Sequence, residues 1–224
     1  MNDQLNIYDR LLLLPLFQGM NKTDLTLVAG QTKFGFQRHH QGRTIVSEGD
    51  SCDHLHFLMQ GTLEVTTHSA NHTYSIIESL PAPAILQPEH IFGLTQRYTR
   101  SFVAQTPCNM MSLDKSEVMR LTEEFIVFRL NLLNIISTQS QRLQRRLWLQ
   151  PSQDLKQSIV RFIEARCLRP TGKKTVLIKM TRLAELLNDS RLNVSRALNS
   201  LQSQGLLTLS RGRIEIEDFR QLLP

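Results

Sequence analysis

The chain has 224 residues, of which 41% are hydrophobic and 21% charged, with a net charge of +6, a composition typical of a globular protein with a buried core. No apolar run approaches the ~18–20 residues of a membrane span, and the polar start at residues 1–10 is unlike a signal peptide. Three widely separated cysteines (Cys52, Cys108 and Cys167) provide neither a disulfide framework nor a metal-spaced pair, so we expect a reduced protein of the cytoplasm that contacts no membrane.

The whole charge surplus lies in the last third of the chain. Residues 1–149 carry 13 basic and 13 acidic side chains, whereas residues 150–224 carry 13 basic and 7 acidic ones. A local basic surplus suits a polyanionic partner such as nucleic acid, because phosphate contacts release condensed counterions. The alternative is an ordinary solvated basic surface.

The first 113 residues are predicted to form helices followed by a β-rich unit. Residues 5–31 have a helical pattern that Pro15 interrupts, and Asn21-Lys22-Thr23-Asp24 predicts a capped restart of the helix. Short β-rich runs separated by turn residues then predict a closed or sandwiched β unit. The runs lie at 43–47, 55–59, 62–67, 73–78, 102–105 and 109–113.

Asp114 is predicted to begin one long helix, since Asp114 and Glu117 have the spacing of a capping box. Apolar residues follow at alternating intervals of three and four, a heptad stripe that we assign to a dimer seam. The seam consists of Val118, Leu121, Phe125, Phe128, Leu132 and Ile135. A second stripe consists of Ile126, Leu130, Leu133 and Ile136. Two apolar faces predict contact with the helix's own β unit and with a second chain, although a single buried core helix is the alternative.

Pro151 marks the expected hinge before a smaller helical unit. The predicted domains are residues 1–113, 114–150 and 151–224. The smaller unit is expected to contain, in order, a helix at 154–168, a strand at 176–179, two short helices, and a hairpin at 206–216 around Arg211-Gly212.

The two short helices have the pattern of a helix-turn-helix, with a tight corner at Asn188. Thr181 suits the N-cap of the first helix and Ser190 that of the second, while Gly205 stands at the C′ position. Apolar residues of the second helix recur on one face, which must pack on the first helix. They are Val194, Ala197, Leu198 and Leu201.

The opposite face of this second helix carries side chains suited to DNA recognition. Arg191 and Arg196 can each grip a guanine with two hydrogen bonds, and Asn193 and Asn199 can read adenine or bind phosphate. Leu192 lies in the middle of this face, where it suits a thymine methyl. Hydroxyl residues and the basic residues that flank the two helices are suited to contact the phosphate backbone of DNA. The alternative is that Arg191 or Arg196 is an ordinary surface or salt-bridging arginine. The predicted DNA contacts are Thr181, Arg182, Arg191, Leu192, Asn193, Ser195, Arg196, Asn199, Arg211 and Arg213.

These features together resemble the cyclic-AMP receptor protein / fumarate–nitrate regulator (Crp/Fnr) family over nearly the whole chain. Residues 179–182 and 190–196 are similar to the family's recognition segment. The matching positions of the β unit are Ile45, Glu48-Gly49-Asp50, Leu55, Phe57-Leu58 and Gly61. The resemblance implies an α+β fold with an N-terminal cyclic-nucleotide-binding-like β-roll (jelly roll), a long dimerisation helix and a C-terminal winged helix-turn-helix. Leu192 stands where the family usually has an acidic residue, so the family's usual half-site is not expected.

The resemblance also suggests where an effector would bind. Family members that bind cyclic nucleotides use a Gly-Glu pair and a later Arg-Ser/Thr pair, so the candidate pocket here is Glu89, Arg100 and Ser101. Pro88 replaces the glycine and removes a backbone donor. We therefore predict no cofactor and do not expect a cyclic nucleotide. Three scattered cysteines do not supply the cluster that the family's iron–sulfur members need.

Histidines gather at 39–40, 54–56 and 68–72. His54 and His56 share one face of a strand, but no third ligand is placed by the sequence, so we expect solvated histidines and no metal or haem site. No nucleophile elbow, P-loop or paired catalytic carboxylate is present, so we expect no enzyme.

The sequence therefore predicts a homodimeric, sequence-specific transcription regulator that binds double-stranded DNA. The resemblance allows RNA polymerase and a small-molecule effector as further partners. One alternative is a ligand-binding regulatory module whose C-terminal domain docks protein instead of DNA. Another is a regulator that has lost effector control.

Overall fold

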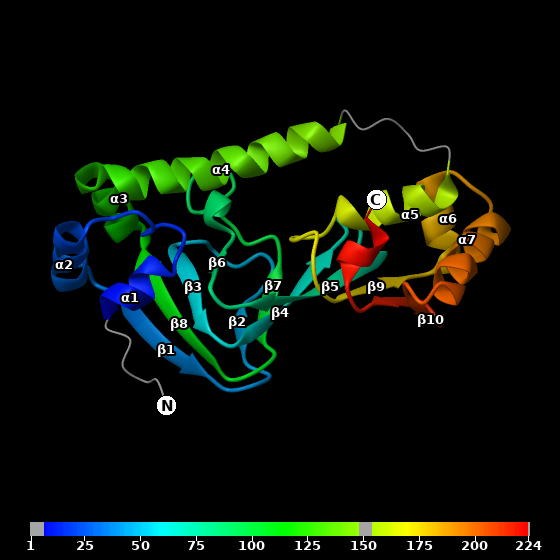
Figure 1. Cartoon of the computed structure of the whole chain (residues 1–224), viewed down its shortest axis with the longest axis horizontal. Coiled ribbons are helices and arrows are strands. Elements are labelled where there is room, and N and C mark those ends of the chain that lie inside the picture. The colour runs from blue at the N-terminus through cyan, green and yellow to red at the C-terminus, as the bar shows by residue number, and fades with distance from the viewer. Residues whose placement is uncertain (1–6, 148–153, 224) are drawn as a thin grey trace. The chain divides into compact units, whose positions relative to one another are not determined.

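The computed structural model describes residues 7–147 and 154–223, and its contacts divide the chain into two units. Unit 1 comprises residues 1–63 and 80–145, and unit 2 comprises residues 64–79 and 146–224. Unit 2 thus includes a segment from the middle of the β-rich region, residues 64–79, which we call the arm. The predicted hinge at Pro151 lies outside the described residues. Figure 1 labels most of the helices and strands of both units.

The strands of unit 1 form antiparallel pairs. Four of them make a sheet in the order β1-β8-β3-β6, and β2 pairs separately with β7. Their bounds are β1 Gly35–His39, β2 Thr44–Val46, β3 His54–Gln60, β6 Ala84–Leu86, β7 Ser101–Ala104 and β8 Cys108–Asp114. The predicted runs in this unit are confirmed, but β1 and β6 were missed. Four of the five residues of β1 are exposed, and β6 has only three residues, so neither shows an apolar alternation.

The helices of unit 1 lie before and after these strands in the sequence. They are α1 Ile7–Leu12, α2 Lys22–Gln31, α3 Lys115–Glu124 and α4 Ile126–Leu147, and the short 3-10 helix η1 is Pro88–His90. Asn21 caps α2 by accepting a hydrogen bond from the Asp24 backbone N–H at 2.8 Å. Asp114 likewise caps α3 by accepting from the Glu117 N–H at 2.8 Å. The predicted N-cap at Asp114 is therefore confirmed, and the capped restart predicted at residues 21–24 has Asn21 as its cap.

The single long helix expected from Asp114 is interrupted at Phe125. This residue has extended backbone angles (φ −120°, ψ 104°) and separates α3 from α4. The interruption lets α3 pack on β3 and β8, while α4 brings the ring of Phe128 to 5.3 Å from that of Phe17. No glycine or proline marks the break, so the apolar periodicity gave no sign of it.

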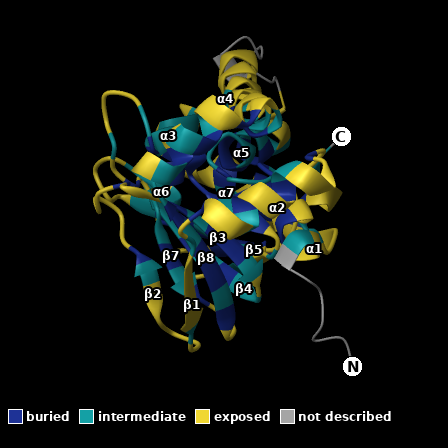
Figure 2. Ribbon diagram, turned by 90° about the vertical axis from the view of Figure 1, so that its left-hand side faces the viewer, coloured by how far each residue is buried: buried dark blue, intermediate teal, exposed yellow. Residues whose placement is uncertain are grey.

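The expected dimer seam lies mostly in the interior of unit 1. Five of its six side chains are at most 8% exposed, namely Val118, Leu121, Phe125, Phe128 and Leu132, and Ile135 is half-buried. The seam assignment was therefore wrong at those five positions, because a side chain in the unit's own core cannot meet a second chain. The second stripe is the exposed one, with Ile126, Leu130 and Leu133 each at least 50% exposed. Figure 2 shows much of α4 as exposed. Periodicity alone could not tell which apolar stripe faces the core.

Unit 2 combines the arm with the C-terminal third of the chain. Its strands are hydrogen-bonded in the order β10-β11-β9-β5-β4. The elements are β4 Thr62–His68, β5 Tyr74–Pro81, α5 Leu155–Glu164, β9 Lys174–Ile178, α6 Met180–Leu187, α7 Arg191–Ser203, β10 Thr208–Ser210, β11 Arg213–Ile216 and the 3-10 helix η2 Phe219–Leu222. The predicted helices, strand and hairpin of the C-terminal region are all present, and each differs by only a few residues at its ends.

The arm is joined to β9 by antiparallel pairing between β5 and β9, in which Ile76 faces Val176 and Glu78 faces Lys174. Ile76 is 1% exposed and belongs to the same core as the apolar residues of α5 and α7. Lys174 and Glu78 form a fully buried ion pair, with 2.7 Å between Nζ and Oε1. Glu78 also accepts a hydrogen bond from the Leu168 N–H at 2.7 Å. The arm is thus part of the core of unit 2.

Candidate nucleic-acid interface

Helices α6 and α7 meet at the predicted tight corner, where Asn188 adopts the left-handed conformation (φ 52°, ψ 45°). The corner is closed by the Asp189 N–H, which donates to the Ala184 carbonyl at 3.0 Å. Lys179 occupies the N-cap position of α6, without a side-chain bond. The expectation that Thr181 caps this helix was wrong, because α6 begins at Met180 and Thr181 lies exposed in its first turn.

Both predicted ends of α7 are confirmed. The Ser190 hydroxyl accepts from the Asn193 N–H at 3.1 Å, and Gly205 follows the C-cap Gln204 with φ 73°. A glycine takes this left-handed conformation without steric cost. The Leu206 N–H then donates to the Leu201 carbonyl at 3.1 Å, which ends the helix.

One face of α7 is buried against the rest of unit 2. The predicted apolar stripe of Val194, Ala197, Leu198 and Leu201 is at most 9% exposed and shares a core with Leu183 and Ala184 of α6. This packing fixes the rotation of α7 about its axis, so the opposite side chains must point away from the core.

The outward face of α7 carries the side chains that the sequence assigns to base contacts. Arg191, Leu192, Arg196 and Asn199 are exposed, and Ser195 is half-buried. In the part of the chain that the structure describes, neither Arg191 nor Arg196 forms an ion pair. Their guanidinium groups are therefore not neutralised by a described carboxylate, as the salt-bridging alternative would require.

The two asparagines of α7 are held within the helix. The Asn193 side chain donates to Asp189 Oδ1 at 2.9 Å, and its backbone N–H is bound by Ser190. The Asn199 side chain donates to Ser195 Oγ at 3.4 Å. The Asn193 side chain is thus held at the corner between α6 and α7. The Asn199 side chain would break only one long hydrogen bond on binding another partner.

Two of the flanking arginines have carboxylate partners. Arg182 donates to Glu185 at 2.9 Å and to the Thr73 hydroxyl of the arm at 3.2 Å. Arg213 binds Glu215 across 2.6 Å. Arg211 is exposed at the turn between β10 and β11 and has no ion pair with a described residue. Sequence reasoning missed Thr73 because 109 positions separate it from Arg182 and no local pattern joins them.

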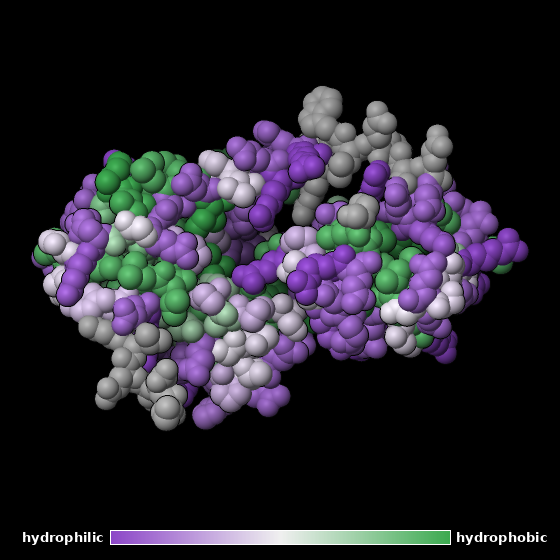
Figure 3. Space-filling model, viewed as in Figure 1, coloured by the Kyte–Doolittle hydropathy of each residue, from purple (hydrophilic) through white to green (hydrophobic). Residues whose placement is uncertain are grey.

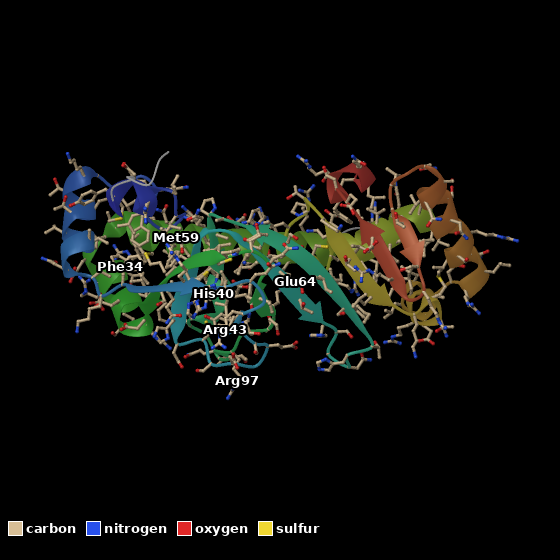
Figure 4. The ribbon with its side chains drawn as sticks, turned by 90° about the horizontal axis from the view of Figure 1, so that it is seen from below. Phe34, His40, Arg43, Met59, Glu64 and Arg97 are labelled. Atoms are coloured by element: carbon tan, nitrogen blue, oxygen red, sulfur yellow. The ribbon has the colours of Figure 1, made fainter. Side chains whose placement is uncertain are left out.

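The candidate effector residues lie in unit 1, and the structure does not join them to one another. Glu89 is in η1, and its Oε2 atom is buried without a hydrogen-bond partner among the described residues. The Ser101 hydroxyl instead accepts from the Glu48 N–H at 3.0 Å, and Arg100 is half-buried. The nearby Arg97, labelled in Figure 4, donates to the Gly49 carbonyl at 2.8 Å.

Gln87, which sequence reasoning did not single out, closes this segment of unit 1. It is 4% exposed and has a left-handed backbone (φ 39°) directly before Pro88. Its side chain donates to Thr99 Oγ1 at 2.6 Å and accepts from the Thr99 N–H at 3.1 Å. The Gln87 amide thus links the start of η1 to the segment that leads through Arg100 into β7.

One histidine of unit 1, His56, has a strongly lowered pKa. Burial lowers the pKa of His56 to about 4, with the neighbouring His54 and His39 acting in the same direction. The His56 ring stacks near His54 at 6.1 Å and lies 6.3 Å from the Tyr98 ring. Among the described residues, no three His, Cys, Asp or Glu side chains are placed to hold a metal ion.

Both parts of the chain match models of known domain families. A model of the cyclic nucleotide-binding domain matches residues 36–125, and a model of the Crp-like helix-turn-helix domain matches residues 141–223. No curated protein matches the chain in sequence.

Solved structures share the fold at low identity. The catabolite activator protein of Thermus thermophilus is 18% identical, with a TM-score of 0.50 over 93% of this chain and 96% of that one. A crp/fnr-family transcriptional regulator from Eubacterium rectale is 18% identical, with a TM-score of 0.51 over 97% of each chain. The sensor domain of the regulator DNR from Pseudomonas aeruginosa is 16% identical, with a TM-score of 0.52 over 66% of this chain and 96% of that one.

Proposed function

The chain is a DNA-binding transcription regulator of the Crp/Fnr family, and from this premise we propose that it binds specific duplex sites as a homodimer, with α7 in the major groove. The main support for this proposal is the outward face of α7. Arg191 and Arg196 are exposed there, form no ion pair with a described residue, and lie opposite a buried stripe. Arg191 and Arg196 are proposed to grip guanine, and Ser195 and Arg211 to bind phosphate. Thr181, Arg182, Asn193, Asn199 and Arg213 are proposed as further contacts of the same interface.

We propose that the homodimer forms through the exposed stripe of α4. Ile126, Leu130 and Leu133 follow one another at helical spacing and would lose contact with water in a paired helix. Figure 3 shows hydrophobic surface around the start of α4 and a hydrophilic surface at its far end. A two-fold dimer of this kind would read two half-sites roughly 34–36 Å apart, one turn of the duplex.

The match to a cyclic nucleotide-binding domain supports a small-molecule effector in unit 1, and we propose that this effector is not a cyclic nucleotide. Pro88 lacks a backbone N–H that could donate to a phosphate. The unpartnered Oε2 of Glu89 fits a ligand that donates a hydrogen bond. Calorimetry with cyclic AMP and cyclic GMP should then show no micromolar binding, and clear binding would contradict this part of the proposal.

None of the described helices combines the length and apolar character of a membrane span. A regulator of this kind is proposed to act in the cytoplasm, where its targets and RNA polymerase are found.

The proposed function is tested by selecting bound sequences from a random duplex pool with the full-length chain. We expect an enriched palindromic site, and an affinity that falls steeply as salt is raised, because several phosphate contacts release counterions. Negligible binding to any duplex at low salt would overturn the proposal. Sedimentation of the same preparation measures whether the chain is a dimer.

A further inference from the structure

Helix α7 presents one large apolar side chain to solvent. Leu192 is 59% exposed, whereas the other aliphatic residues of α7 are at most 9% exposed. Leu192 does not belong to the hydrophobic core of unit 2. A single exposed leucine is common on protein surfaces, so its meaning depends on what surrounds it.

The surroundings of Leu192 favour a polyanion. On an α-helix, Leu192 lies beside the residues three and four positions later, Ser195 and Arg196. Arg191 is the preceding residue, so two guanidinium groups without described ion-pair partners flank this leucine. The apolar group therefore lies at the centre of the surface that would enter a DNA groove. This inference rests on the proposed function.

Besides the two arginines, Asn199 is the side chain of this face best placed to read a base by hydrogen bonds, since its bond to Ser195 is long at 3.4 Å. Asn193 is bound to Asp189 and Ser190, as described above. The helix itself contains no acidic residue between Arg191 and Ser203, so it offers no carboxylate to accept from cytosine N4. The one apolar feature that a base pair shows in the major groove is the C5 methyl group of thymine.

We propose that Leu192 determines specificity for thymine at one position of each half-site by packing on its C5 methyl group. Removing that methyl should weaken binding about fourfold. This is the change in affinity expected when one apolar carbon group is no longer buried away from water in the complex. The contact distinguishes thymine from cytosine by shape and hydrophobicity without a hydrogen bond.

The test uses the selected duplex and the full-length chain. Each thymine of the half-site is replaced singly by deoxyuridine, which lacks only the methyl group. We expect one position at which wild-type binding falls about fourfold, and no fall at that position for Leu192→Ala. At the same position, 5-methylcytosine should bind the wild type more tightly than cytosine, and Leu192→Ala should not distinguish them.

The control variant is Leu94→Ala, the same truncation at a fully exposed leucine of unit 1. It should keep the full sensitivity to deoxyuridine. A second variant, Leu192→Glu, should shift the preferred base from thymine to cytosine, because a carboxylate accepts from cytosine N4.

The outcomes separate this inference from the proposed function. If a specific site is selected but no thymine is sensitive to loss of its methyl, or if Leu192→Ala keeps the sensitivity, Leu192 does not read thymine and the proposed function stands. If no sequence is enriched, the proposed function fails and this inference fails with it.

Discussion

The arginines proposed to contact DNA differ in whether they already form ion pairs within unit 2. Arg182 and Arg213 are paired with Glu185 and Glu215, so a phosphate would compete with a carboxylate for each of them. Arg191 and Arg196 have no described ion pair and point away from the core. Exposure and pairing therefore rank the candidate contacts more sharply than residue type does.

Replacing Arg191 or Arg196 by alanine should abolish the preference for guanine at one position of the site. A lost bidentate contact costs about 1–3 kcal/mol, so specific affinity should fall about 5- to 150-fold. Fluorescence anisotropy with the selected and a scrambled duplex measures the change, and circular dichroism should show an unaltered melting curve. Arg213→Ala is the control and should weaken both duplexes about equally. If either α7 variant unfolds unit 2, the orientation of the helix is wrong.

His56 should make unit 1 less stable in mild acid. Its folded pKa of about 4 lies below the ordinary histidine value of 6.5, so between these pH values the unfolded chain binds a proton that the folded chain does not. The free energy of unfolding should therefore fall by about 3 kcal/mol as pH drops from 6.5 to 4. Urea titrations at several pH values measure this, and His56→Gln should remove that part of the slope. A His56 resonance that titrates above pH 6 would contradict the assignment.

At the scale of elements, α4 shows why two apolar stripes have to be told apart. The inner stripe holds the helix on unit 1, and the outer stripe of Ile126, Leu130 and Leu133 is open to a partner. A substitution on each stripe should therefore have a different consequence.

Leu130→Asp should give folded monomers, because it places a charge in the proposed dimer contact without disturbing the core. Light scattering should show half the wild-type mass, and affinity for the selected duplex should fall at least tenfold, since one half-site is lost. Thr138→Asp, exposed and off the stripe, is the matched control and should remain dimeric. Leu132→Asp should instead destabilise unit 1, because Leu132 is 5% exposed. A stable dimer of Leu130→Asp would refute the contact.

Local elements were predictable from the sequence, and long-range pairings were not. Caps and short-range periodicity specify α2 and α7, periodicity alone specifies α6, and the outward face of α7 followed from its apolar stripe. The break at Phe125 depends on how both flanking helices meet the strands, which no local pattern records. The joining of β5 to β9 pairs residues almost a hundred positions apart. The roles of Gln87 and Thr73 were missed because their side-chain partners lie 12 and 109 positions away, beyond the reach of helix and strand periodicity.

At the scale of the whole molecule, the two units are not consecutive stretches of sequence. The arm supplies Tyr74, Ile76 and Glu78 to the unit that carries α7. Arg166 donates to the Tyr74 hydroxyl at 2.7 Å, and Lys174 pairs with Glu78 in the interior. The stability of the DNA-binding unit therefore depends on residues encoded far from it.

Lys174→Met should destabilise unit 2 by about 3–5 kcal/mol, because it leaves the Glu78 carboxylate buried without its cation. Urea denaturation followed by circular dichroism measures the loss. The double variant Lys174→Met/Glu78→Gln should recover most of it, since no unpaired charge remains. Lys173→Met is the control, because the ion pair of Lys173 with Glu217 is exposed to solvent and should contribute little to the free energy of unfolding. A double variant no more stable than Lys174→Met would contradict this account.

The pairing of β5 with β9 also decides how this protein can be divided. A fragment that starts after the predicted hinge would contain α7 and the β10–β11 hairpin but would expose β9 as an open sheet edge. Unpaired backbone groups on such an edge recruit strands from other molecules, so the fragment should self-associate instead of remaining a monomeric DNA binder. A soluble version of the DNA-binding unit would need residues 64–79 supplied as a fused or added strand.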